Sequence, residues 1–450
     1  MINYIKNNVK RGLDRFKNSF LLSDDLPFTE IFPVDVINDI VENTPSKRST
    51  VFAPLVTLKA FFLQVLGDDG SCKHAVAGVL IDRLSEGKSA NTINTGPYTK
   101  ARQRLPLKQL ESAVTAVGKG LHQKMPKAWR WMGYNVVMAD GMTVLMPDTP
   151  ANQAEFPQQQ NQKQGLGFPI MRIVALISLA AGSLIAYSYG PYEGKGTGET
   201  SLLSQLFGHL TAGDLLLADR YYCTFAICAL MQACGVPVLF QMHARKKVDL
   251  NLGVSLGPKD HLSEWVKPKL RPVWMSIEDY AALPDKITVR EFSVKGKVYL
   301  TTLIDSKLYN KQDLVILYKN RWKIELAFRT IKTDMNMEML RCKNPDNVKK
   351  EIAVYLLAYN IIRGNLAQAA SLYQKVPNQL SFKSAVQLIT QATGQLLSWT
   401  GVRLIKAILA LLKAISSTAI GRQKRKGQPR VIKRRPKSYP LMNVPRNRYC

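Results

Sequence analysis

YNVVMADG at 134–141 and DLLLADR at 214–220 are two short apolar runs, and each ends in an acidic residue, Asp140 and Asp219. Short apolar runs bounded by turn residues are typical of buried strands. MRIVALISLAAGSLIAYSYG at 171–190 reads as two further strands joined across Gly182. We therefore expect Asp140 and Asp219 to lie at the C-terminal ends of two strands of one buried sheet.

Helical patterns separate these strands. GETSLLSQLFGHL (198–210) and TFAICALMQACG (224–235) are expected to be helices, and VPVLFQMH (236–243) a further strand. Strands that alternate with helices indicate a mixed sheet covered by helices on both faces, and such sheets bind ligands at strand ends. The fold class expected is therefore α/β.

The regions on either side have other patterns. Short helices are expected at 57–67, 72–84 and 95–106, and a β-rich insertion with a hairpin at Lys295 and Gly296 is expected before a long helix at 311–335. A second apolar helix follows at 351–370. The expected parts are an N-terminal helical domain at 1–125, a core at 126–243, the insertion at 244–310, the rest of the core at 311–370, and a C-terminal helical region with a basic tail at 371–450.

The chain is strongly basic. Its 450 residues contain 62 Lys and Arg against 33 Asp and Glu, a formal net charge of +29. Eleven of these cations fall within 421–450, where no acid occurs, and the excess continues through the rest of the chain. A polyanion such as nucleic acid is the partner expected from this charge. The six cysteines lack the paired close spacing of a zinc site, and neither an export signal nor a membrane span is evident, so we expect a cytoplasmic protein.

LYKNRWKIELAFRTIK (317–332) carries the most informative pattern. On a regular helix, Tyr318, Arg321, Glu325 and Lys332 share a sector of about 60°. An apolar stripe lies beside them, so the helix is expected to pack on the sheet and direct Glu325 toward the strand ends. Taken alone, the pattern favours an ordinary helix that has an Arg321–Glu325 ion pair.

Three acids that converge repel each other unless a cation neutralises them. A site of Asp140, Asp219 and Glu325 therefore implies divalent metal ions, two Mg²⁺ per site with Mn²⁺ able to substitute. Such a pair can drive an in-line attack on phosphorus, which suits a basic protein.

At these residues the sequence resembles the IS-four family of bacterial insertion-sequence transposases. The resemblance rests on DGMTVLMPDTPANQAEFP at 140–157, ADRYYCTF at 218–225 and the Tyr318, Arg321, Glu325, Lys332 signature. It implies an RNase H-like fold, a catalytic and metal-binding triad of Asp140, Asp219 and Glu325, and a homodimer that pairs two transposon ends. It also implies a cut-and-paste DNA transposase that acts on terminal inverted repeats and target DNA in the bacterial cytoplasm, at the nucleoid.

The resemblance places Tyr318, Arg321 and Lys332 on DNA phosphates. Trp322 also matches the family pattern, although a core aromatic is the interpretation that we favour for it over base stacking. In the N-terminal bundle, Lys100, Arg102 and Arg104 are candidate DNA contacts, with a solvated basic face as an equal alternative. Two other classes stay open: another RNase H-like nuclease, and a DNA-binding relative that has lost turnover.

Overall fold

The computed structural model describes residues 34–45, 51–67, 69–89, 93–243, 248–250, 252–396, 399–418 and 448. The basic tail from Arg422 therefore lies outside the described residues, apart from residue 448.

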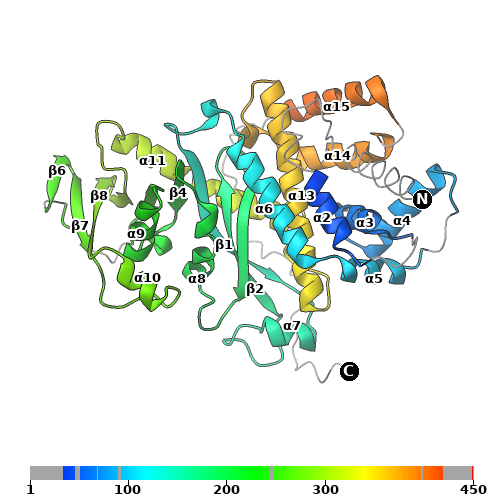
Figure 1. The fold of residues 1–450 in the computed structure, drawn as a ribbon, viewed down its shortest axis with the longest axis horizontal. Helices are drawn as coiled ribbons and strands as arrows, with labels where there is room; N and C mark the ends of the chain where they lie inside the picture. The colour runs from blue at the N-terminus through cyan, green and yellow to red at the C-terminus, as the bar shows by residue number, and fades with distance from the viewer. Residues whose placement is uncertain are drawn as a thin grey trace, which may run out of the picture.

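The core is one nine-stranded sheet with the order β3-β2-β1-β4-β5-β9-β8-β7-β6. β1 runs antiparallel to β2 and parallel to β4, and β4 runs parallel to β5. This mixed sheet with flanking helices confirms the α/β, RNase H-like class (Figure 1). The first five strands are β1 (Asn135–Leu145), β2 (Ile170–Ser178), β3 (Leu184–Pro191), β4 (Asp214–Ala218) and β5 (Val238–Gln241).

The β-rich insertion extends this same sheet. β9 pairs with β5 in antiparallel orientation, and β8, β7 and β6 follow outward to the far end of the molecule (Figure 1). Lys295 and Gly296 both have positive φ, 51° and 74°, which is the conformation of a type I′ hairpin turn. The expected hairpin is therefore confirmed. The strands are β6 (Val254–Gly257), β7 (Asp260–Val266), β8 (Lys286–Val294) and β9 (Lys297–Thr301).

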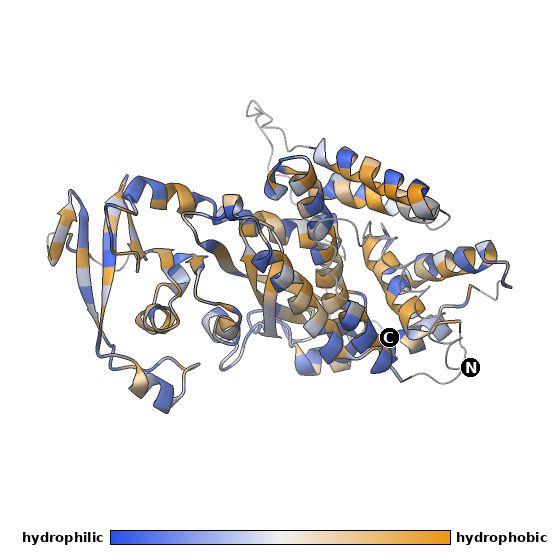
Figure 2. Ribbon diagram, turned by 45° about the horizontal axis from the view of Figure 1, so that its top comes forward, coloured by the Kyte–Doolittle hydropathy of each residue, from blue (hydrophilic) through white to orange (hydrophobic). Residues whose placement is uncertain are grey.

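Alternate residues of the central strands face two different cores. Val136 and Met138 of β1 lie in the core that contains α6 (Leu107–Gln123) and α13 (Pro345–Leu372). Val137 and Ala139 lie in the core formed with α8 (Glu199–Ser204) and α9 (Phe225–Ala233). Figure 2 shows hydrophobic residues concentrated around the central strands and the helices beside them.

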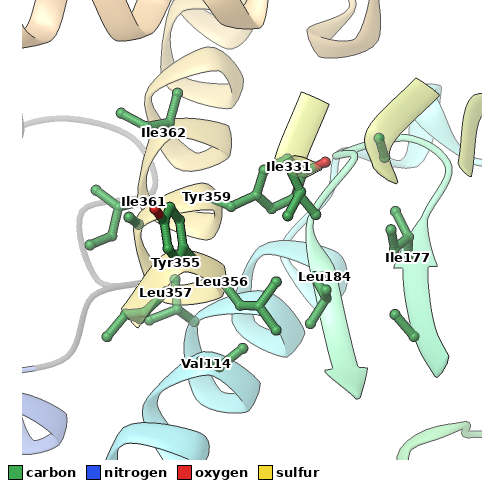
Figure 3. Close-up of a cluster of buried hydrophobic side chains, with 14 of the residues drawn as sticks. Val114, Ile177, Leu184, Ile331, Tyr355, Leu356, Leu357, Tyr359, Ile361 and Ile362 are labelled. Atoms are coloured by element: carbon green, nitrogen blue, oxygen red, sulfur yellow. The ribbon is translucent and has the colours of Figure 1, made fainter. Parts of the chain in front are cut away.

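The contact between α6, α13 and β3 is close. Side chains of all three elements, with Ile177 of β2 and Ile331, point toward one another in Figure 3. Within it, the buried Asn360 amide donates to the Val114 and Leu184 carbonyl oxygens at 3.0 and 2.9 Å and accepts from the Leu184 N–H at 2.8 Å. A Cβ on Gly118 would lie 1.8 Å from the Leu184 oxygen, so only glycine fits there.

Helices make up both ends of the described chain. The N-terminal ones are α2 (Val34–Glu42), which was not expected, and α3 (Pro54–Leu66), α4 (Cys72–Ser85) and α5 (Gly96–Arg104), which lie close to the expected positions. The C-terminal ones are α14 (Phe382–Leu396) and α15 (Gly401–Ser416). α7 (Pro150–Glu155) and α10 (Ile277–Ala282) are short. Within the described ranges, no helix combines the length and the apolarity needed to cross a membrane.

The expected single helix at 311–335 is wrong. The chain forms α11 (Lys311–Lys319), then α12 (Trp322–Arg329), then a π-helical segment, η5 (Thr330–Asp334). Between α11 and α12 the N–H groups of Arg321 and Ile324 bond to carbonyl oxygens three residues earlier, which tightens the turn. The tight turn and the π segment change the angular spacing, so the four signature residues do not follow one regular helical stripe.

Candidate active site

Asp140 and Asp219 come directly after the last residues through which β1 and β4 pair with each other. The parallel register ends at Ala139 opposite Ala218, so Asp140 and Asp219 come next on adjacent strands. Side chains alternate between the two faces of a sheet along each strand. Asp140 and Asp219 are therefore on the same face as Met138 and Leu217, the face that packs on α6 and α13. Asp219 lies at the strand end as expected, but the same expectation for Asp140 is wrong. β1 continues to Leu145 because β2 pairs along it, with Asp140 opposite Ala175.

Backbone N–H groups orient both carboxylates. Gly141 donates to Asp140 Oδ1 at 2.8 Å. Asp219 caps a short 3₁₀ turn, and its Oδ1 accepts from the Tyr221 N–H at 2.6 Å. The second oxygen of each carboxylate is thereby left for other partners.

Arg321 joins Asp140 to the third acid. Its Nη1 lies 3.3 Å from Asp140 Oδ2, and its Nη2 lies 2.7 Å from Glu325 Oε1. The side chains are 17%, 20% and 32% exposed for Arg321, Asp140 and Glu325, so solvent still reaches the site. The Arg321–Glu325 ion pair expected for an ordinary helix is therefore present, and the Arg321 guanidinium also contacts Asp140.

The helix that carries Glu325 is tied to the strand that carries Asp140. Leu145, at the end of β1, accepts from the Leu340 N–H at 2.9 Å and donates to the Glu338 carbonyl oxygen at 3.1 Å. Ile324 and Phe328 are buried against the same core as β1. The apolar side of the predicted helix is therefore confirmed, and it directs Glu325 toward Asp140.

The electrostatics of the site favour a bound cation. Burial raises the pKa of Asp140 to about 6, and the negative charges of Asp219 and Glu199 add to the effect. The Gly141 N–H and the Arg321 guanidinium act in the opposite direction. A nearby positive charge stabilises the ionised form of a buried carboxylate such as Asp140. In this structure the Arg321 guanidinium supplies that charge.

Glu199 is an acid near the site that the sequence did not indicate. It lies on α8, on the opposite face of the sheet, and approaches β1 because residue 141 has no side chain. A Cβ on Gly141 would lie 2.8 Å from Glu199 Oε1. Tyr222 donates its hydroxyl to Glu199 Oε2 at 3.3 Å, and Arg172 Nε is 4.0 Å from Oε1. The only local signal is its place in the first turn of a helix.

The remaining signature residues surround Arg321 and Glu325. Tyr318 is half-buried, with its ring edge-to-face against Tyr299 at 5.2 Å, and burial raises the pKa of its hydroxyl to about 12. Trp322 is 58% exposed, so the interpretation as a core aromatic is wrong. Lys332 lies in the π-helical segment and is partly exposed.

The N-terminal candidates divide. Lys100 and Arg104 are exposed on α5. Arg102 is buried: its Nη1 donates to Gln64 Oε1 at 2.9 Å, and its guanidinium lies over the rings of Phe61 and Tyr98. Arg102 therefore stabilises the helical bundle, and the expectation that it contacts DNA does not fit its position.

The acids suit divalent metal in their chemistry but are not preassembled around one. Carboxylate oxygens are the hard ligands that Mg²⁺ and Mn²⁺ prefer. Within the described ranges, no three His, Cys, Asp or Glu side chains are arranged to hold an ion. Arg321 lies between Asp140 and Glu325, so a metal would take over the charge that the guanidinium supplies here.

Similarity to known proteins shows to which family the chain belongs. Residues 131–361 match the model of the family "Transposase DDE domain", and this match spans half of the chain. The chain belongs to this family. This chain is 29% identical to transposase InsG of insertion sequence element IS4 from Escherichia coli K12 over 348 residues, which cover 76% of this chain and 77% of InsG.

Other relatives match less. Over 67 residues, the transposase of insertion sequence element IS421 from E. coli is 36% identical, covering 15% of this chain and 18% of that one. Among solved structures, a piggyBac transposase synaptic complex with hairpin DNA aligns at a TM-score of 0.45 and 12% identity, covering 85% and 84% of the two chains. The family membership makes this chain a DDE transposase, an enzyme that cleaves and transfers DNA, and InsG is similar to it over about three quarters of both chains. Transposases of this family use divalent metal ions.

Proposed function

We propose that Asp140, Asp219 and Glu325 are the catalytic acids of this transposase. They hold two Mg²⁺ ions, replaceable by Mn²⁺, and the enzyme cleaves the terminal inverted repeats and joins the ends to target DNA by cut-and-paste transposition. The observation that carries the proposal is the parallel register of β1 and β4, which puts Asp140 beside Asp219, together with the guanidinium that links Asp140 to Glu325.

Bound Mg²⁺ would activate a water or a 3′ hydroxyl and stabilise the leaving oxygen in an in-line displacement at phosphorus. The chain's own residues prepare the site. The Gly141 and Tyr221 N–H groups fix one oxygen of each strand acid and leave the other oxygen for the ion. Arg321, released from Asp140 and Glu325, turns its donors to a DNA phosphate.

The phosphate contacts are proposed for Tyr318, Arg321 and Lys332, which position the backbone without reading bases. Trp322, exposed next to Arg321, offers a ring on which an unpaired base stacks. The helical part at 1–125 binds the transposon end through Lys100 and Arg104. Two copies of the chain pair two ends, in the bacterial cytoplasm at the nucleoid.

The test separates metal binding from turnover. Ala at Asp140, Asp219 or Glu325 should abolish cleavage of DNA that carries the element ends and leave binding of that DNA in place, because the basic surface is unchanged. Asp285→Ala is the matched control, since the Asp285 side chain is 98% exposed at the β-rich end.

A second readout does not depend on turnover. Fe²⁺ exchanged into the metal site reacts with added hydrogen peroxide, with ascorbate to return Fe³⁺ to Fe²⁺, and generates hydroxyl radicals that cut the nearby backbone. Wild-type cuts should therefore map close to positions 140, 219 and 325. Each Ala variant should lose them, and Asp285→Ala should keep them. Cleavage of end DNA by any of the three Ala variants would remove that residue from the site.

A further inference from the structure

A cavity of about 260 Å³ lies on the other side of α12 from Glu325. Its walls come from β1 and β2, from the turn after β2, from α12 and η5, from α13 and from the start of α14. Asp140, Asp219 and Glu325 do not line it. Its charged lining is mostly cationic: Lys323, Arg329, Arg363 and Lys383, against one acid, Asp334.

Arg363 is the residue that makes this cavity unusual. Only 9% of its surface is exposed. Its Nε donates to the Tyr359 hydroxyl oxygen at 2.9 Å, and its guanidinium lies 5.0 and 5.1 Å from the ring centres of Tyr359 and Phe382. Among the residues that the structure describes, no carboxylate lies within ion-pair distance of it, although it borders the cavity. A buried guanidinium is normally paired with an anion, because its desolvation is otherwise uncompensated.

The backbone is shaped around this guanidinium. Gly182 has φ of +69°, and a Cβ there would lie 3.0 Å from Arg363 Cζ. The Gly182 carbonyl oxygen accepts from the Tyr359 hydroxyl at 2.7 Å, which fixes the ring beneath Arg363. The guanidinium is therefore held in place rather than free to swing into solvent.

Further cations line the same cavity. Lys323 is half-buried and lines the cavity, so its ammonium lies within reach of an anion bound there. Lys383 and Arg329 are exposed at the rim and leave a path from solvent. The Ser381 hydroxyl is a further donor at the wall.

We propose that this cavity is a phosphate subsite that takes one phosphodiester group of the bound DNA strand. Lys323 and Glu325 are two residues apart on α12, about 3 Å along the axis. The cavity lies on the opposite side of α12, which is about 10–12 Å across, so a strand that passes Glu325 and continues over α12 brings a phosphate further along the strand to the buried guanidinium. The proposal rests on the DNA binding of this enzyme and adds a contact outside the family signature.

The first experiment measures binding of end DNA without divalent metal, so that catalysis plays no part. Lys323→Ala should weaken the complex about tenfold, since a hydrogen bond to a charged group is worth about that factor. The slope of log affinity against log salt should fall by about one phosphate contact. Lys297→Ala, an exposed lysine at the start of β9, is the control and should change neither. Arg363→Lys keeps the positive charge but loses the planar set of N–H donors of the guanidinium, and it therefore tests the buried donor. The melting temperature of this variant shows whether it folds.

The second experiment identifies the source of the phosphate. Neutral methylphosphonate linkages are placed one at a time along the end DNA. One position should weaken wild-type binding about tenfold and have no further effect in Lys323→Ala, because the same contact is already lost. If every position weakens both proteins equally, the proposal is wrong. It is also overturned if inorganic phosphate stabilises the wild type through Lys323 while no linkage is coupled, since the cavity would then bind free phosphate.

These outcomes are independent of the catalytic assignment. Asp140→Ala should retain the coupling between Lys323 and the linkage, because the strand acid does not line the cavity. Loss of coupling with intact cleavage would refute the subsite alone, and intact coupling with cleavage by an acid variant would refute the catalytic proposal alone.

Discussion

Arg321 and the metal compete for the same two carboxylates, and Arg321→Ala tests this directly. In the wild type, the guanidinium makes one contact of 3.3 Å to Asp140 and one of 2.7 Å to Glu325, between side chains that are 17% to 32% exposed. Partly exposed ion pairs of this kind contribute about 0–1 kcal/mol each, so the two together contribute about 1 kcal/mol.

Without divalent metal, the variant should therefore melt about 2–4 °C lower than the wild type, as a 1 kcal/mol change does in a cooperative unit of roughly 200 residues. With metal this difference in melting temperature should disappear. A metal that enters the wild type must first displace the guanidinium, so its apparent affinity is reduced by the same 1 kcal/mol, about fivefold. Arg321→Ala should bind Mn²⁺ about fivefold more tightly, and saturating Mg²⁺ should close the gap in melting temperature.

Isothermal titration with Mn²⁺ and thermal unfolding with and without Mg²⁺ measure both effects. Lys332→Ala is the control, because Lys332 makes no ion pair with the acids within the described residues and should leave metal affinity unchanged. The reasoning is refuted if Arg321→Ala binds Mn²⁺ no more tightly than the wild type. That result would mean that the guanidinium and the ion occupy different places.

Three further predictions concern folding and DNA contact. Gly118→Ala should lower the free energy of unfolding by at least about 2 kcal/mol in a urea titration, because the new Cβ would lie 1.8 Å from the Leu184 oxygen. Gly364→Ala, with its nearest neighbours at 3.9 Å, should be neutral or stabilising, and equal losses in the two variants would contradict the packing argument. Trp322→Ala should leave the melting temperature within about 1 °C, since the ring is 58% exposed, and should weaken end DNA binding by about 1–3 kcal/mol if a base stacks on it; unchanged binding would exclude stacking. Burial raises the pKa of Glu351 above its usual 4.5, so folding takes up a proton and the stability due to this group falls as pH rises through the raised folded value. Glu351→Gln should flatten that fall in unfolding curves measured from pH 4 to 8, and identical slopes would show that the pKa of Glu351 does not rise on folding.

The strands and their acids could be predicted because their signals are local. An apolar run that ends in Asp219 needs only neighbouring residues to be recognised, and the Lys295–Gly296 turn needs only two. The family resemblance then supplied the order of the motifs. These features are specified by short stretches of sequence, and the structure has them close to where we expected them.

The remaining features depend on partners far away in the chain. The strand through Asp140 continues because β2 pairs with it, although Gly141 suggested an end. Arg102 is buried because Gln64, 38 positions away, accepts its hydrogen bond. Glu199 approaches the site from the opposite face of the sheet, and the cavity at Arg363 needs five separate segments. Periodicity carries no information about such contacts, so no reading of one segment could have found them.

The unequal lengths of β1 and β4 make the three acids unequal in their freedom to move. Asp140 lies inside a strand whose backbone is paired with β2 before and after it, so its position is fixed by the sheet. Asp219 begins a 3₁₀ turn just beyond a strand end, and Glu325 lies one turn after a break between two helices. The Asp140 carboxylate is thus held in place by the sheet. Asp219 and Glu325 belong to segments that can shift without breaking the hydrogen bonds between strands. We expect any rearrangement that accompanies DNA binding to move Asp219 and Glu325 toward Asp140. The distances between the three carboxylates would then change only through movement of Asp219 and Glu325.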